Sequence, residues 1–140
     1  MISPRNTVLS QLETDLALIN GTGVYTADIQ EIKRGIYHID DFDAFPAVSF
    51  WCENDEVEER LMGNTYLREL SVYMFGYAAG VSEVTAIHQF EEDVEYFLDN
   101  DFTYSNNVLI DNVILYEKGT ISTTDDAAMF LLNFRIKYEK

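Results

Sequence analysis

One stretch of this sequence, Phe130-Leu131-Leu132-Asn133-Phe134-Arg135-Ile136-Lys137-Tyr138-Glu139, places a large apolar side chain at every second position. Successive side chains of a strand point to opposite faces of its sheet, so a period of two predicts a strand with one buried face. The apolar set is Phe130, Leu132, Phe134, Ile136 and Tyr138. The chain therefore needs further elements to cover this face.

Two segments, Pro4–Asn20 and Ser82–Asp99, carry apolar residues at steps of three and four. This spacing is typical of an amphipathic helix, and Ser82 is a suitable residue to cap the second one. We expect both helices to share one core with the last strand. That core comprises Leu12, Leu16, Ile87, Phe90, Val94, Leu132 and Phe134.

The sequence predicts four further strands from local alternation and turn residues. They are Ala27–Arg34, Ala47–Cys52, Tyr66–Tyr77 and Val108–Glu117. Between them, Glu53–Asn64 predicts a solvated hairpin loop, and turns are expected at Asn106-Asn107, Lys118-Gly119-Thr120 and Asp125-Asp126. The order α-β-β-β-α-β-β indicates an α+β fold. We expect a mainly antiparallel sheet of about four to five strands, with neighbours paired and both helices on one face.

Length and composition predict a single domain over residues 1–140. The chain is 47% hydrophobic and 14% aromatic, which excludes intrinsic disorder and predicts a substantial core. Its formal net charge of −16 argues against tight binding to nucleic acid or to an anionic membrane, because such binding needs clustered Lys and Arg. A lone Cys52 and the lack of a visible signal peptide or membrane span favour an intracellular protein.

No residue pattern predicts catalysis, a cofactor or a metal, so we expect no enzyme. The acidic run Asp40-Asp41-Phe42-Asp43 lacks the glycine and the later Glu of a calcium loop, and a solvated loop is the better interpretation than a cation site. The two histidines, His38 and His88, stand apart, and His88 borders the apolar stripe of its helix. We interpret Cys52 as a buried structural thiol, because nothing around it supplies the positive neighbourhood of a nucleophile.

The strand Tyr66–Tyr77 has two apolar faces towards its end. Leu70, Val72 and Met74 share one face, and Tyr73, Phe75 and Tyr77 share the other. Because helices cover only one face of a sheet, the second face predicts a contact with another subunit or protein. The candidate interface residues are Trp51, Tyr73, Phe75 and Tyr77.

Five packing segments together resemble the tail-terminator, or tail-completion, family of long-tailed bacteriophages. They are the N-terminal helix, Phe45–Phe50, Leu67–Phe75, Phe90–Leu98 and Phe134–Tyr138. The resemblance spans nearly the whole chain. It implies an α+β subunit that forms a ring, expected to be a hexamer, which caps the tail tube, ends its polymerisation and joins it to the head.

The resemblance also implies partners and a location. The partners are further copies of the chain, the tail tube protein and a head-completion or connector protein. DNA passes through the channel without specific binding, and no membrane is involved. The protein is then part of the tail or neck of a virion that assembles in the host cytoplasm. The alternatives are another neck or tail-tube ring protein, or a small intracellular binding module without catalysis.

Within such a ring, the acidic segment after the second strand has two expected positions. Its charged residues are Glu53, Asp55, Glu56, Glu58 and Glu59. They line the lumen, where repulsion keeps DNA moving, or they reach the adjoining ring. The simpler interpretation is that their charge only keeps the protein soluble.

Overall fold

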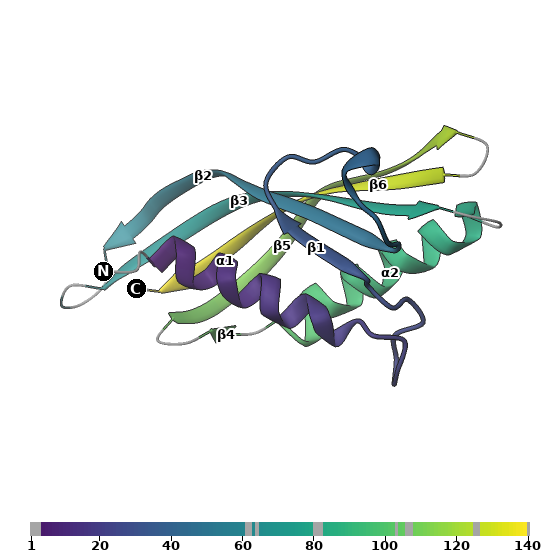
Figure 1. The fold of residues 1–140 in the computed structure, drawn as a ribbon. Helices are drawn as coiled ribbons and strands as arrows, with labels where there is room; N and C mark the ends of the chain where they lie inside the picture. The colour runs from purple at the N-terminus through teal and green to yellow at the C-terminus, as the bar shows by residue number, and fades with distance from the viewer. Residues whose placement is uncertain are drawn as a thin grey trace.

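The computed structural model describes residues 4–60, 63, 65–79, 83–102, 104–105, 108–124 and 127–139. Its elements are α1 (Pro4–Asp15), the 3₁₀ helix η1 (Leu16–Leu18), β1 (Glu31–Arg34), the 3₁₀ helix η2 (Ile39–Asp41), β2 (Ala47–Arg60), β3 (Tyr66–Ala79), α2 (Glu83–Asn100), β4 (Tyr104–Ser105), β5 (Val108–Thr124) and β6 (Ala127–Glu139). The described strands form one six-stranded sheet in the order β1-β2-β3-β6-β5-β4 (Figure 1). The predicted α+β class is confirmed, and the two-residue β4 is the strand that the sequence did not predict.

Both long helices lie on the same side of the sheet (Figure 1). The predicted common core is confirmed, since all seven of its residues are buried in one cluster: Leu12, Leu16, Ile87, Phe90, Val94, Leu132 and Phe134. Each apolar side chain on this face has exchanged water for close-packed neighbours, which is the main favourable term in folding. The apolar faces of the two helices therefore pack against the apolar face of the strands, as the spacing of these residues predicts.

A glycine in β3 fixes how α2 sits on the sheet. Gly76 is paired with Phe130 of β6, and a Cβ at Gly76 would overlap the Phe130 ring. Phe90 of α2 then meets the same ring edge to face, with the centroids 5.0 Å apart. This geometry is favourable for aromatic pairs, and it joins α2 to the two central strands at one point.

The predicted loop at Glu53–Asn64 is wrong for residues 53–60, which belong to β2. The register runs on through Glu56↔Glu69 to Arg60↔Tyr66, with two irregularities, between Cys52 and Asn54 and between Val57 and Glu59. Glu and Asp have weak strand propensity, but backbone pairing with Tyr66–Ser71 of β3 decides the structure here. The predicted turn at Lys118-Gly119-Thr120 is wrong for the same reason, because β5 continues there against β6.

The first strand also differs from the prediction. It begins at Glu31 and runs parallel to β2, with Glu31 opposite Ala47. A parallel pair needs a long crossover, and residues 35–46 provide one by crossing the sheet on the side away from the helices (Figure 1). The residues before β1 form a loop held by the buried Asp93 of α2, whose carboxylate accepts the N–H groups of Thr26 and Ala27 at 2.9 and 2.7 Å.

The helix boundaries are close to those predicted. The first helix ends at Asp15 and continues as η1 to Leu18, short of the expected Asn20. The second runs from Glu83 to Asn100. The predicted cap at Ser82 and the turns at Asn106-Asn107 and Asp125-Asp126 lie outside the described residues.

Replacing Phe134 by Ala is expected to lower the free energy of unfolding by about 3–5 kcal/mol, because the change leaves a cavity in a fully buried site. Urea unfolding measures the loss. The matched control is Ile36→Ala, at a side chain that is 66% exposed, which should change stability by less than about 0.5 kcal/mol. A loss below about 1 kcal/mol for Phe134→Ala would contradict the position of this ring in the core.

Candidate assembly surface

The face of the sheet opposite the helices is covered in part by the chain itself. The crossover 35–46 lays Phe42 against Tyr77, with ring centroids 5.5 Å apart, and both residues are buried together with Ala47. The Tyr77 hydroxyl donates a hydrogen bond to the Tyr37 carbonyl at 2.7 Å. Burial raises the pKa of the Tyr77 phenol above its ordinary value. Of the four interface candidates, Tyr77 is thus an internal residue.

The other three candidates lie together beyond the crossover, and we refer to Trp51, Tyr73 and Phe75 as the aromatic cluster. Trp51 and Tyr73 face each other in the register and stack at 5.7 Å with planes 14° apart. Phe75 meets Trp51 edge to face at 5.1 Å. All three side chains are half-buried, so each still presents a part of its ring to solvent.

A buried amide adjoins this cluster. Asn133 of β6 is opposite Tyr73 and is only 8% exposed. Among the groups that the structure describes, its Oδ1 atom has no hydrogen-bond donor. A buried acceptor without a donor costs free energy, so this amide is a local cost to stability beside the cluster.

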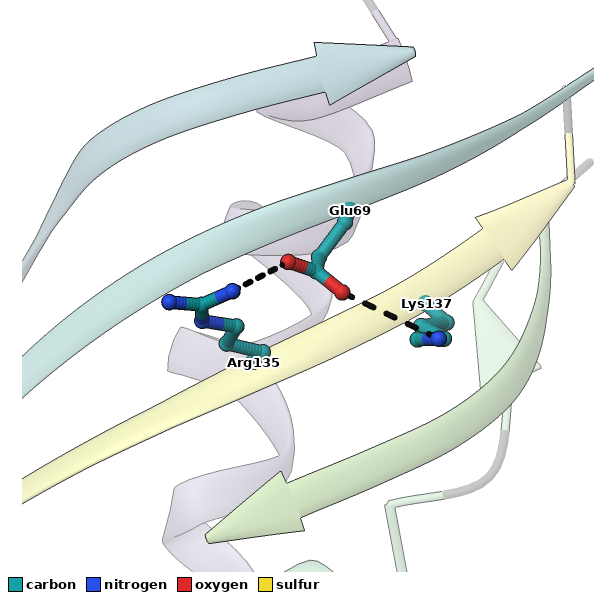
Figure 2. A network of polar contacts seen from close by, with 3 residues as sticks. All are labelled: Glu69, Arg135 and Lys137. Carbon is teal, nitrogen blue, oxygen red and sulfur yellow. Dashed lines mark hydrogen bonds and ion pairs between the residues drawn. The ribbon is translucent and has the colours of Figure 1, made fainter. Parts of the chain in front are cut away.

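A charged network lies further along the same face (Figure 2). Glu69 of β3 has a side chain that is only 9% exposed, and its Oε1 accepts a hydrogen bond from Arg135 Nη1 at 2.8 Å. Lys137 Nζ lies 3.9 Å from the other carboxylate oxygen. The two cations alternate with core residues in β6, so the period of two places them on this face. Their shared carboxylate depends on the β3–β6 register, which the sequence does not reveal.

The predicted acidic residues lie on a strand. Glu53 is exposed, and its Oε2 accepts the Trp51 indole N–H at 3.3 Å. Asp55, Glu56, Glu58 and Glu59 follow within β2, at the end of the strand away from the crossover. The hydrogen bond between Trp51 and Glu53 therefore links the start of the acidic segment to the aromatic cluster.

The sequence also singled out the acidic run at residues 40–43, the two histidines and Cys52. Asp41 caps the short η2 helix by accepting the His38 N–H at 2.9 Å, and His88 is exposed on α2. Cys52 is half-buried against the core, so the prediction of a fully buried thiol is wrong in degree. Within the described ranges, no three His, Cys, Asp or Glu residues are grouped to hold a metal ion. In the same ranges, no helix combines the length and apolar character needed to cross a membrane.

Comparison with known proteins gives one finding about the fold. No model of a protein family matches the sequence, and the search of curated proteins gave no match. Among solved structures, the chain is similar to one in the structure titled "Virion of native gene transfer agent (GTA) particle", with a TM-score of 0.53 at 12% identity. The alignment covers 99% of this chain and 96% of the other. The likeness is one of fold, and it extends over the full length of both chains.

Replacing Tyr77 by Phe removes a buried hydrogen bond and is expected to cost about 1 kcal/mol near neutral pH. The raised pKa means that the unfolded phenol ionises first, so this group's stabilisation is lost as the pH rises above about 10. The variant should lose less stability than the wild type between about pH 8 and about pH 11, measured by urea unfolding. Equal losses in both proteins would contradict the internal position of this hydroxyl.

Replacing Glu69 by Gln is expected to lower stability by about 1–2 kcal/mol, because it removes the negative partner of Arg135 and Lys137. The cations keep part of their hydration, which limits the loss. Urea unfolding at low and high salt measures it, and the difference from wild type should shrink as salt rises. Glu92→Gln, at an exposed position of α2, is the control and should have little effect. Equal effects of the two variants would contradict a stabilising role for the network.

Proposed function

We propose that this chain is a structural protein of a phage-like virion, without catalytic activity, that assembles into a ring at the end of the tail tube. The observation that carries the proposal is the full-length likeness of its fold to a chain of a gene transfer agent virion. The packing segments that resemble the tail-terminator family support the finer role. In this role a ring, expected to be a hexamer, ends tube polymerisation and provides the surface for head joining.

The two sides of the subunit suit a ring. A ring needs head-to-tail contacts between two different surfaces of each copy. One side of the sheet carries α1 and α2 (Figure 1). The opposite face carries the aromatic cluster. Trp and Tyr are enriched where protein interfaces are most strongly stabilised, because they bury a large area with little loss of side-chain freedom.

The negative net charge of the subunit opposes its self-assembly. Copies with a formal charge of −16 repel one another, so apolar contact has to supply the attraction between them. The aromatic cluster is the part of the second face best suited to that contact, with the tail tube protein or another copy as its partner. The acidic segment 53–59 then faces the lumen or an adjoining ring, where a head-completion or connector protein binds.

The double substitution Tyr73→Glu with Phe75→Glu tests the proposal. Both side chains are half-buried on the second face, so the variant should remain folded but fail to form rings or to cap tail tubes. The matched control places the same charges at Ile36 and Tyr96, which are 66% and 44% exposed. It should assemble like the wild type. Sizing chromatography and negative-stain electron microscopy measure assembly, and circular dichroism measures folding.

Trp51 is the single tryptophan of the chain and reports directly on the cluster. Its emission should shift to shorter wavelength when the wild type assembles or is mixed with tail tubes. A wild type that stays monomeric and ignores tail tubes would refute the ring. An unfolded double variant would show that the cluster stabilises the subunit and that the interface lies elsewhere.

A further inference from the structure

The acidic half of β2 forms an open edge of the sheet. The neighbouring β1 pairs only with residues Ala47–Phe50. The Gly35 N–H donates to the Phe50 carbonyl at 2.8 Å, and there the chain turns away through a positive φ that favours glycine. No described strand pairs with Trp51–Arg60 on this side, and Figure 1 shows β2 continuing past the end of β1.

A strand edge that no neighbouring strand covers turns backbone N–H and C=O groups outward. Such an edge accepts an extended peptide as an additional strand, with backbone hydrogen bonds for affinity and side chains for selectivity. In Trp51–Arg60 five residues are acidic and one is basic. Trp51 is half-buried, and Val57 is 53% exposed, so the edge also offers apolar contacts.

We propose that the open edge of β2, Trp51–Arg60, binds an extended segment rich in Lys or Arg from a different protein, which adds to the sheet as a further strand. The segment's location rests on the function proposed above, in which it belongs to a protein that adjoins the ring. Its chemistry follows from the charge and the backbone of the edge alone.

The first part of the same edge already holds an added strand. β1, with the sequence Glu-Ile-Lys-Arg, occupies the first part of this edge and ends in Lys33 and Arg34. It pairs in register with β2 up to Phe50, which is one residue before the open edge begins. An incoming basic strand would continue the line that β1 starts, over the part of β2 where the acidic residues are concentrated.

A second copy of the chain is a poorer occupant. Five of its strand cations already have partners: Lys33 donates to the Asp41 carbonyl, Arg34 to Asn6 and Ser10, Lys118 contacts Glu95, and Arg135 and Lys137 contact Glu69. Like net charges also oppose the contact.

The test uses synthetic peptides as long as the open edge, in which Lys alternates with Val. One control peptide carries Glu in place of Lys. A second keeps every Lys but is N-methylated at alternate residues, which removes the hydrogen-bond donors along one side. Trp51 fluorescence measures binding to the full chain, and hydrogen exchange by NMR locates it. We expect only the unmodified Lys peptide to bind and to protect backbone amides within Trp51–Arg60.

Substitution then tests the charge contribution. Glu56→Gln with Glu58→Gln should weaken binding of the Lys peptide by about tenfold at low salt, because two attractive charges are lost. The matched control, Glu92→Gln with Asp99→Asn, removes two exposed charges from α2 and should bind the peptide like the wild type. Both variants keep Trp51, so the same fluorescence signal applies.

Three results would overturn the inference. Equal binding of the N-methylated peptide would mean ionic attraction without strand addition. Protection outside Trp51–Arg60, or no binding, would mean that the edge does not take this ligand. Protection of the same amides that rises with protein concentration, without peptide, would identify a second copy as the occupant. Ring formation with failed peptide binding would refute this inference alone, whereas peptide binding without rings would refute only the proposed function.

Discussion

The pairing of β3 with β6 is the interaction on which the rest of the structure depends. The two strands run antiparallel over an unbroken register from Leu67↔Glu139 to Ala79↔Ala127, at the centre of the sheet. Because a slip of one residue would move every side chain to the opposite face, this register fixes both faces at once. The Phe130 ring over Gly76 opposes such a slip, since any other residue of β3 at that position would bring a Cβ into the ring. The same ring receives Phe90, which couples the helix layer to the register.

The two faces that result differ in how they are covered. The helix face is closed by α1 and α2 with apolar residues from every long strand. On the other face, the crossover 35–46 covers Tyr77 and Ala47 but leaves the aromatic cluster half-exposed. A parallel β1–β2 pair is what brings the crossover there, because a hairpin between these strands would leave no chain to span the sheet. The direction of β1 relative to β2 thus decides which aromatic residues are internal and which can contact a partner.

What the sequence predicted and what it missed have separate physical causes. Both amphipathic helices, the alternating strand ending at Tyr138 and the shared core follow from periodicity, which is a local property. Strand lengths depend on what lies alongside. Asp55 and Lys118 lie within strands because partners such as Leu70 and Leu132 are paired with them, and no local pattern records that pairing. The internal position of Tyr77 was missed for the same reason, since the sequence shows its strand face but not the crossover above it. The Glu69 network could not be predicted because it depends on the β3–β6 register, which pairs residues that are far apart in the sequence.

The acidic edge of β2, like the aromatic cluster, is a part of the sheet that the described elements leave uncovered. A long open edge risks pairing with any other edge, and charge is a common protection against it. Negative charge excludes other copies of an acidic chain while leaving the backbone groups available, so it selects among partners instead of closing the edge. Register irregularities interrupt both long outer strands, three in β5 and two in β2, and they hinder every partner alike. The acidic charge of β2 acts differently, because a partner of opposite charge can reverse it.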